Sequence, residues 1–180
     1  MPENLSFRYG LFLLYLQTEK EDNVMEKMLT IKYKEYPSVD ALGVADAELM
    51  RRAVAATDGA YAPYSGFRVG AAVRLADGSV VVGSNQENAA YPSGLCAERT
   101  AIFAASAQRP EVRDYDALAI VGRNAAGELC EASPCGACRQ VLLEYEQRQG
   151  HPLRVLCLLA GGAVREVGSV ADLMPFSFAL

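Results

Sequence analysis

Residues 96–99 read Cys-Ala-Glu-Arg, and residues 134–138 read Pro-Cys-Gly-Ala-Cys. The cysteines of these two stretches can serve as thiolate ligands of one zinc ion: Cys96, Cys135 and Cys138. Zinc prefers four tetrahedral ligands, and a catalytic zinc site keeps the fourth position for water, which can ionise near neutral pH. Because Glu98 is not needed as a ligand, its carboxylate is free to move protons. We therefore predict a zinc site with Glu98 as its catalytic acid and base.

The second stretch also indicates a local structure. Cys135 and Cys138 are three residues apart, so at the start of a helix both side chains point to the same side, where free amides and the helix dipole stabilise thiolates. The alternative is a structural zinc site with a fourth protein ligand. The remaining soft ligands in the sequence are Cys130, Cys157 and His151. None of them has a paired spacing with the others, and a structural site gives Glu98 no task, so the sequence favours the catalytic interpretation.

The complete pattern resembles the signature of the zinc nucleobase deaminases, in which a His-x-Glu or Cys-x-Glu pair precedes Pro-Cys-x-x-Cys. Residues 66–72, Gly-Phe-Arg-Val-Gly-Ala-Ala, and residues 85–88, Asn-Gln-Glu-Asn, match the branch that acts on free nucleosides. Over about residues 45–180 the chain is similar to the small cytidine deaminases of the three-cysteine, homotetrameric type. The resemblance implies hydrolysis of cytidine and deoxycytidine to uridine and deoxyuridine with release of ammonia, as in pyrimidine salvage. It also implies one Zn²⁺ cofactor per subunit.

The resemblance further implies roles for substrate-binding residues. Phe67 would pack against the pyrimidine ring. Asn85 and Glu87 would hydrogen-bond the ribose hydroxyls, since alternate residues of a strand point the same way. The backbone amide of Ala97 would stabilise charge on the reacting oxygen. Without the resemblance, a core position for Phe67 and simple turn polarity for the Asn85/Glu87 pair remain open.

Three more roles follow from the resemblance. Tyr91 would reach the ribose in an adjoining subunit's site, and Phe178 would cover a base there. Phe176 is the alternative to Phe178, because the spacing of the C-terminal segment differs from that of some family members. Arg99 would donate to the thiolates and withdraw the net negative charge of a three-thiolate zinc site. The alternative for Arg99 is a salt bridge in the core.

The composition fits one globular domain: the chain has 180 residues, of which 51% are hydrophobic and 22% charged. The net charge is −5 and no dense basic run occurs, which argues against polymeric nucleic acid and for a small neutral ligand. The chain has five cysteines, an odd number, which favours a reducing compartment and hence a cytoplasmic location. No apolar run reaches the ~20 residues of a membrane-spanning helix.

The first part of the chain fits this pattern poorly. Residues 9–16 form an apolar run like the core of a signal peptide, but an acidic residue precedes it and no small-residue cleavage site follows. We interpret residues 1–44 as a poorly ordered or loosely docked extension and residues 45–180 as the catalytic domain. A natural start at Met25 or Met28 is a further hypothesis, which the intact mass of the native protein tests.

Hydrophobic periodicity and turn signals give the expected elements. Helices are expected at residues 46–58, 96–108, 135–147 and 170–173. Strands are expected at residues 67–75, 80–84, 117–121, 153–159 and, as an edge strand, 164–167. An extended lead-in is expected at residues 32–37 and a polar loop at residues 123–132. This order predicts an α/β fold, a three-layer α-β-α sandwich with a mixed sheet of about five strands. Both cysteine stretches follow a strand and begin a helix, where ligand sites gather in such folds.

The helix expected at residues 96–108 is apolar on all sides apart from Glu98 and Arg99. A helix of this kind is buried all round, and in a chain of this length such burial requires neighbouring subunits. We therefore expect a homotetramer whose sites are shared between subunits.

Three other functions compete with nucleoside deamination. They are deamination of an aminonucleoside antibiotic such as blasticidin S, editing of a nucleic acid, and a non-catalytic, zinc-stabilised binding module. Phe67 and the Asn85/Glu87 pair argue against the antibiotic, and the acidic net charge argues against nucleic acid. The sequence does not exclude a module that binds zinc without releasing ammonia.

Overall fold

The computed structural model describes residues 25–178, and the fold lies within residues 31–178. Its strands are β1 (Tyr33–Tyr36), β2 (Arg68–Leu75), β3 (Val80–Ser84), β4 (Tyr115–Arg123), β5 (Leu129–Cys130), β6 (Arg154–Leu158) and β7 (Val164–Val167). Its helices are α2 (Val44–Ala56), α3 (Ala97–Gln108) and α4 (Gly136–Gln149), and its short 3₁₀ segments are η1 (Val39–Ala41), η2 (Thr57–Gly59), η3 (Tyr91–Ser93), η4 (Ala160–Gly162) and η5 (Val170–Leu173). In the described part of the chain, no helix is both long and apolar enough to cross a membrane. Residues 1–24, on which the signal-peptide and start-site interpretations depend, lie outside the described residues.

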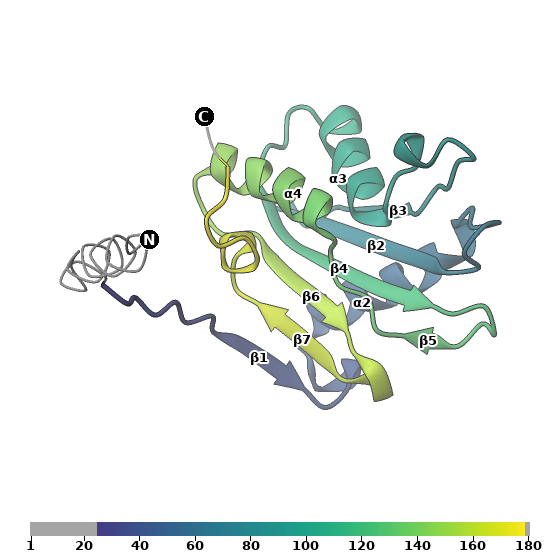
Figure 1. The fold of residues 1–180 in the computed structure, drawn as a ribbon, viewed down its shortest axis with the longest axis horizontal. Coiled ribbons are helices and arrows are strands. Elements are labelled where there is room, and N and C mark those ends of the chain that lie inside the picture. The colour runs from purple at the N-terminus through teal and green to yellow at the C-terminus, as the bar shows by residue number, and fades with distance from the viewer. Residues whose placement is uncertain (1–24, 179–180) are drawn as a thin grey trace, which may run out of the picture. The chain divides into compact units, whose positions relative to one another are not determined.

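The strands of the described chain form one seven-stranded sheet in the order β1-β7-β6-β4-β2-β3, with β5 paired to β4 (Figure 1). Strands β4 and β6 run parallel and all other pairs are antiparallel, which confirms a mixed sheet. The predicted count of about five strands was too low. The additional strands are β1, expected as an extended lead-in, and β5, expected as part of a polar loop. Strand β1 is short and largely polar, and β5 has only two residues, so neither shows the period-two apolar pattern of a half-buried strand.

Strand β7 was predicted with the correct bounds but at the wrong place in the sheet. It was expected at the edge, and it lies between β6 and β1. Strand β1 pairs with it antiparallel, from Tyr33 opposite Val167 to Tyr36 opposite Val164. This pairing comes from a segment that precedes the predicted catalytic domain at residue 45. The division of the chain into an extension and a catalytic domain stays a prediction.

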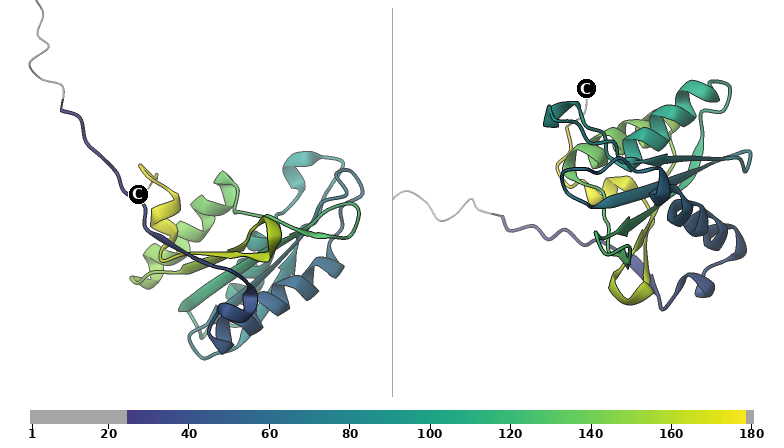
Figure 2. Two further views of the ribbon diagram at one scale, coloured as in Figure 1. Left: turned by 90° about the horizontal axis from the view of Figure 1, so that it is seen from below. Right: turned by 90° about the vertical axis from the view of Figure 1, so that its right-hand side faces the viewer.

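Helix α2 covers one face of the sheet, and helices α3 and α4 cover the other (Figure 2). Strand β2 shows how one strand serves both layers. Ala71, Val73 and Leu75 belong to the buried cluster that includes α3 and α4, whereas Ala72 belongs to the cluster that includes α2. Successive side chains of a strand point to opposite faces, so a continuous apolar strand fills two cores. The three-layer α-β-α sandwich is therefore confirmed.

Helix α3 packs directly on strand β3 at Gly83. A Cβ atom at this position would lie 2.4 Å from the backbone nitrogen of Ala101 and 2.7 Å from the backbone oxygen of Ala97. Only a residue without a side chain permits so close an approach. The contact fixes the first turns of α3 against the strand that leads directly to Asn85.

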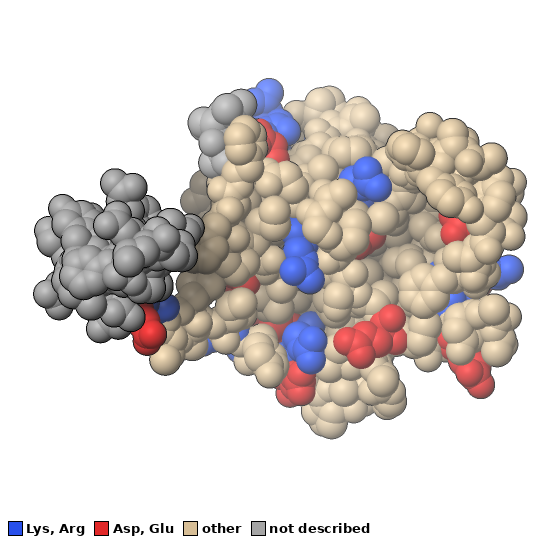
Figure 3. All heavy atoms as spheres, viewed as in Figure 1, with Lys and Arg blue, Asp and Glu red and all other residues tan. Residues whose placement is uncertain are grey.

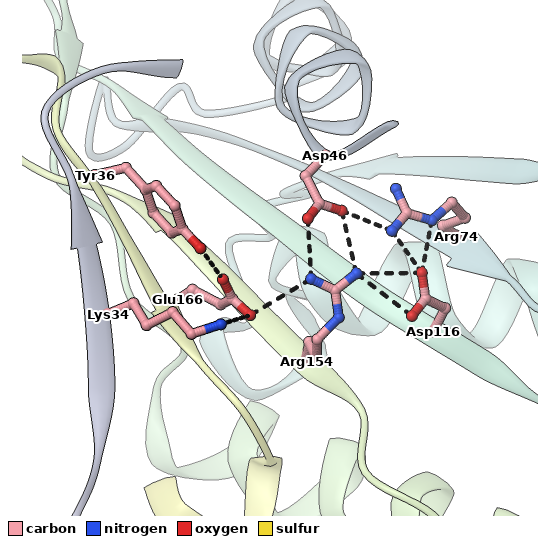
Figure 4. Close-up of polar contacts among 7 residues, drawn as sticks. All are labelled: Lys34, Tyr36, Asp46, Arg74, Asp116, Arg154 and Glu166. Carbon is pink, nitrogen blue, oxygen red and sulfur yellow. Dashed lines mark hydrogen bonds and ion pairs between the residues drawn. The ribbon is translucent and has the colours of Figure 1, made fainter. Parts of the chain in front are cut away.

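A cluster of four charged side chains lies between α2 and the sheet (Figure 4). Arg154 donates to Asp46 at 2.9 Å and to Asp116 at 3.3 Å. Arg74 donates to the same two carboxylates, at 2.6 Å to Asp46 and 2.7 Å to Asp116. The cluster joins the first turn of α2 to β2, β4 and β6.

Strand β1 is attached to this cluster through Glu166 of β7 (Figure 4). The Tyr36 hydroxyl donates to Glu166 at 2.6 Å, and the nitrogens of Lys34 and Arg154 each lie 3.5 Å from the same carboxylate. On the more exposed side, Arg165 donates to Glu35 at 2.9 Å. Polar side chains therefore hold β1, which explains why its sequence lacks an apolar face.

Candidate active site

Two helices begin at the predicted zinc ligands. Cys96 is the N-cap residue of α3 and Cys135 the N-cap residue of α4, and Cys138 lies in the first turn of α4. Both N-cap residues have extended backbone conformations. The free N–H groups and the positive dipole ends of both helices are therefore directed toward the thiols. The helix starts predicted from the two cysteine stretches are confirmed to within one residue.

The three sulfur atoms lie close enough to share one metal ion. The Sγ atoms of Cys96 and Cys135 are 3.8 Å apart, those of Cys135 and Cys138 are 3.5 Å apart, and all three lie within 4.8 Å of one another. Zn–S bonds of about 2.3 Å in a tetrahedron place sulfur atoms about 3.8 Å apart, so the thiols fit a zinc ion. Among the described residues, this trio is the only such group with metal-binding spacing, and Cys130, Cys157 and His151 are not part of it. The predicted zinc cofactor is confirmed.

Glu98 is buried beside the thiols. Its side chain belongs to the first turn of α3, and the residue is only 3% exposed. Burial raises the pKa of Glu98 to about 7, and the negative charge at Cys96 adds to this effect. A carboxyl group with a pKa near the working pH both accepts and donates protons readily. The local environment therefore suits Glu98 for proton transfer.

Arg99 contacts the thiols from the next position of the helix. Its Nη2 atom lies 3.7 Å from the sulfur of Cys96, and the hydrogen bond to this sulfur raises the pKa of Arg99. Its Nε atom is buried without a hydrogen-bond partner among the described residues. The guanidinium thus lies against sulfur, as predicted, and no carboxylate of the described chain forms a salt bridge with it.

The pKa values of Cys96 and Cys138 shift in opposite directions. The hydrogen bond between Cys96 and Cys138, followed by the one from Arg99, lowers the pKa of Cys96 to about 5. The same contact with Cys96, together with burial, raises the pKa of Cys138. Zinc binds thiolates, so loading of the site displaces the protons that remain on the thiols.

A cavity of about 810 Å³ opens beside the thiols. This volume lies in the range of small-molecule sites. Most of the predicted site residues line it: Phe67, Asn85, Glu87, Tyr91, Cys96, Glu98, Arg99 and Cys135. The exceptions are Ala97 and Cys138, which are fully buried, and Phe178, which lies elsewhere on the surface.

Asn85 and Glu87, the two residues predicted to bind the sugar, lie in a segment whose backbone is hydrogen-bonded to Leu95, the residue before the zinc ligand Cys96. Gln86, between Asn85 and Glu87, exchanges two backbone hydrogen bonds with Leu95, of 2.8 and 2.9 Å. Leu95 directly precedes Cys96 in the sequence. Backbone hydrogen bonds therefore hold residues 85–87 at a fixed distance from Cys96.

The side chains of Asn85 and Glu87 brace the segment that carries Phe67. The Oδ1 atom of Asn85 accepts a hydrogen bond from the Val69 amide at 2.7 Å, and its Nδ2 atom donates to the Phe67 carbonyl at 2.9 Å. The carboxylate of Glu87 accepts from the Tyr64 amide at 2.9 Å. Phe67 itself is 36% exposed and lines the cavity, so it is not the core residue that its strand position also allowed.

The aromatic residues predicted to reach an adjoining subunit's site are exposed in the single chain. Tyr91 is 76% exposed, and its ring meets that of Tyr64 edge-on at 6.0 Å. Phe178 is 69% exposed, and its backbone oxygen accepts a hydrogen bond from Gln140 at 3.2 Å. Phe176, the alternative to Phe178, is fully exposed. The roles of Tyr91 and Phe178 in an adjoining subunit's site stay predictions.

Sequence reasoning missed several residues of the cavity wall. No role was predicted for Tyr64, Ser65, Glu131 or Ser133, yet all four line the cavity. Ser65 also bonds to Glu87, which is 22 positions away in the sequence. The local contact of Ser65 is the hydrogen bond that its hydroxyl accepts from the amide of Phe67, two residues further along the chain.

Zinc-dependent hydrolytic deaminases carry an acid–base glutamate two residues after the first zinc ligand and the other two ligands in a Pro-Cys-x-x-Cys segment. The thiols and Glu98 have this arrangement in space as well as in sequence, and the chain is an enzyme of this class. The family model of the cytidine and deoxycytidylate deaminase zinc-binding region matches residues 44–150, which include Glu98 and the three predicted zinc ligands. The chain belongs to this family.

Curated relatives agree with the family match. The chain is 42% identical over 130 residues to the cytidine deaminase of Halalkalibacterium halodurans, a match that covers 72% of this chain and 91% of the relative. It is 38% identical over 135 residues to the cytidine deaminase of Mycobacterium tuberculosis, with 73% of this chain and 88% of the relative covered.

Solved structures show the same fold. The crystal structure of cytidine deaminase from Burkholderia pseudomallei is 43% identical, with a TM-score of 0.63, and the match covers 73% of this chain and 97% of that one. The crystal structure of cytidine deaminase from Mycobacterium tuberculosis is 38% identical, with a TM-score of 0.58, and covers 74% of this chain and 96% of that one.

Proposed function

We propose that this enzyme hydrolyses cytidine and deoxycytidine to uridine and deoxyuridine with release of ammonia. The observation that carries the proposal is the position of Glu98, a carboxylate 3% exposed that lines a nucleoside-sized cavity beside three clustered thiols. The curated relatives that are named cytidine deaminases support the choice of substrate. Free thiol ligands require a reducing compartment, which supports a cytoplasmic enzyme of pyrimidine salvage.

The chain supplies the proton transfers of this reaction. Cys96, Cys135 and Cys138 would hold a zinc ion, which would supply Lewis acidity for the activation of water. Glu98 accepts a proton as water adds to C4 of cytosine, delivers a proton to N3, and helps to protonate the amine that leaves from C4. Water is consumed and ammonia is released, so C4 ends as the carbonyl of uridine.

Two further groups are suited to the charge changes of this reaction. The amide of Ala97, the first residue of α3, is one of the free N–H groups at the helix start and is suited to stabilise charge on the reacting oxygen. Arg99 donates to the sulfur of Cys96 and so withdraws negative charge from the thiolates. Both groups are fixed by the first turn of α3, so they need little rearrangement during the reaction.

The cavity wall supports recognition of a free nucleoside. Phe67 presents an apolar ring for the base, and Asn85 and Glu87 present polar groups for sugar hydroxyls. The face drawn in Figure 3 carries scattered basic and acidic side chains rather than a broad basic patch. Together with the net charge of −5, this distribution argues for a small substrate and against a nucleic acid.

We test the proposal by following the ultraviolet absorbance of cytidine with the purified full-length chain. The expected result is a loss of cytidine absorbance with equimolar release of ammonia, abolished by a zinc chelator and restored by added zinc. A zinc-loaded protein that releases no ammonia from cytidine or deoxycytidine would identify it as a non-catalytic binding module instead.

We also propose that the active form is a homotetramer with shared sites. Phe103 of α3 is 40% exposed in the single chain, and Tyr91 and Phe178 are also exposed. Contact with a neighbouring subunit would bury these aromatic rings. Light scattering coupled to size-exclusion chromatography tests this proposal, with a mass of four chains as the expected result.

A further inference from the structure

Ser65 connects two residues of the cavity wall, Glu87 and Phe67. Its hydroxyl donates to Oε1 of Glu87 at 2.5 Å and accepts a hydrogen bond from the amide of Phe67 at 3.0 Å. The backbone amides of Tyr64 and Ser65 donate to Oε2 of Glu87, at 2.9 and 3.3 Å. Both carboxylate oxygens are thus held by the segment that leads into Phe67.

These contacts leave Glu87 with a limited and defined hydrogen-bonding capacity. An ionised carboxylate accepts about four hydrogen bonds, and Tyr64 and Ser65 supply three of them. The hydrogen bond from the Ser65 hydroxyl, followed by that from the Tyr64 amide, holds the pKa of Glu87 below its usual range. Glu87 therefore stays an ionised acceptor at neutral pH, with room for a hydroxyl donor from the cavity.

We propose that Ser65 is a positioning residue for sugar recognition, which holds the Glu87 carboxylate at a fixed distance from the base-contacting ring of Phe67. The proposal rests on the proposed function, because it takes the ligand of Glu87 to be a sugar hydroxyl of a nucleoside. Ser65 does not itself need to contact the substrate.

Removal of the hydroxyl has a specific consequence. In Ser65→Ala, Glu87 keeps its amide contacts on Oε2 but loses its short bond on Oε1, and the Phe67 amide loses its acceptor. The carboxylate is then free to turn about its terminal bond. The loss should fall on substrates that carry the recognised hydroxyl and should spare the proton transfer by Glu98.

The test compares two substrates in four proteins. The proteins are the wild type, Ser65→Ala, Ser65→Thr and the control Ser79→Ala, and the substrates are cytidine and 2′,3′-dideoxycytidine. Ser79 is a matched control because its hydroxyl also donates to a nearby carboxylate, Asp77 at 2.6 Å, in the hairpin between β2 and β3. Steady-state kinetics give kcat and KM for each combination.

The expected result is a substrate-dependent loss. Ser65→Ala should lower kcat/KM for cytidine about tenfold, mainly through KM, since one hydrogen bond to a charged group is worth about this factor. The same change should lower kcat/KM for 2′,3′-dideoxycytidine less than about twofold. Ser65→Thr should restore most of the loss, and Ser79→Ala should leave both substrates unchanged.

Two kinetic results would overturn the proposal while leaving the proposed function intact. One is an equal loss for both substrates in Ser65→Ala, which would make Ser65 a general structural residue. The other is an unchanged kcat/KM for cytidine.

If the wild type converts neither nucleoside, the proposed function fails, and calorimetric titration with uridine and 2′,3′-dideoxyuridine decides the role of Ser65. Binding of uridine about tenfold weaker in Ser65→Ala, with 2′,3′-dideoxyuridine unaffected, would support it. Equal affinities in both proteins, or no binding by the wild type, would overturn it.

Discussion

Charged side chains lie partly or fully buried on both sides of the sheet, and the two groups are paired differently. Between α2 and the sheet, burial alone would raise the pKa of Asp46, but hydrogen bonds from Arg154 and Arg74 outweigh it and hold that pKa below its usual range. At the start of α3, burial is not compensated in this way, and the pKa of Glu98 rises to about 7. Burial raises the pKa of both carboxyl groups, but it prevails only at Glu98, which is the more deeply buried. Asp46 therefore stays an anion, and Glu98 can carry a proton.

The difference lies in the partners that each carboxylate has. Asp46 receives hydrogen bonds from two guanidinium groups. Glu98 has one arginine as its neighbour in sequence, and the contact of Arg99 goes to the sulfur of Cys96. Pairing with two guanidinium groups marks Asp46 as structural, whereas Glu98, which has no ion-pair partner among the described residues, belongs to a functional site.

The largest effect should follow from removal of one zinc ligand. In Cys138→Ser, the thiol cluster loses its most buried sulfur, so zinc content should fall from about one per chain to near zero. Turnover of cytidine should fall by more than about a hundredfold. Metal analysis and the absorbance assay measure both quantities. Cys130→Ser is the control, because this thiol lies outside the cluster, and it should keep zinc and activity.

The second largest effect should be on stability and should appear in the paired cluster. Arg154→Met leaves Asp46 and Asp116 with one guanidinium instead of two, which should lower the free energy of unfolding by about 2–3 kcal/mol. Urea unfolding measures this change. Arg165→Met is the control: its pair with Glu35 is exposed, and its loss should cost less than about 0.5 kcal/mol. Equal costs for the two variants would contradict a structural role for the cluster.

A change on the active-site side that touches no charge should have a moderate effect on activity. A Cβ atom at Gly122 would lie 2.9 Å from Cζ of Phe67 and 3.0 Å from the backbone oxygen of Cys130. Gly122→Ala should therefore push the Phe67 ring and lower kcat/KM for cytidine about tenfold. Gly43→Ala is the control, because a Cβ atom there has no neighbour within 4 Å. Unchanged kinetics in Gly122→Ala would show that the position of the ring does not limit activity.

The smallest effect should be a pH dependence of the paired cluster. Because the pKa of Asp46 is lowered by folding, its ionised form contributes stability above the unfolded pKa of about 4, and this contribution is lost as pH falls through the folded pKa. The difference in unfolding free energy between the wild type and Asp46→Asn should therefore shrink, by less than about 1 kcal/mol, as pH falls below about 4. Both proteins are measured at the same zinc concentration, so that metal loss affects both equally. A difference that grows as pH falls would reverse the assigned sign.

The sequence allowed the chemistry of the site and most of the fold to be predicted, because their signals are local. The cysteine spacing specified the starts of α3 and α4, and the apolar runs specified β2, β3, β6 and β7. The cap of η5 is also local, because the hydroxyl oxygen of Ser169 accepts a hydrogen bond from the Ala171 amide two residues on.

The features that were missed depend on contacts between distant parts of the chain. Strand β1 is held by the hydrogen bond from Tyr36 to Glu166, whose partners are 130 positions apart. The hydrogen bonds of Asn85 and Glu87 with the segment around Phe67 likewise form only when the loop at Tyr64 lies against residues 85–87. Polar residues at these positions give no periodic pattern, so only the folded chain shows which groups they bind.

The measurement that tests the central claim most directly is the rate of cytidine turnover by zinc-loaded Glu98→Gln. The amide has nearly the same size as the carboxylate but cannot carry a proton. We expect this variant to keep about one zinc per chain and to lose turnover by about 10²–10⁴-fold. Near-normal turnover in the zinc-loaded variant would contradict the role of Glu98 as the proton carrier.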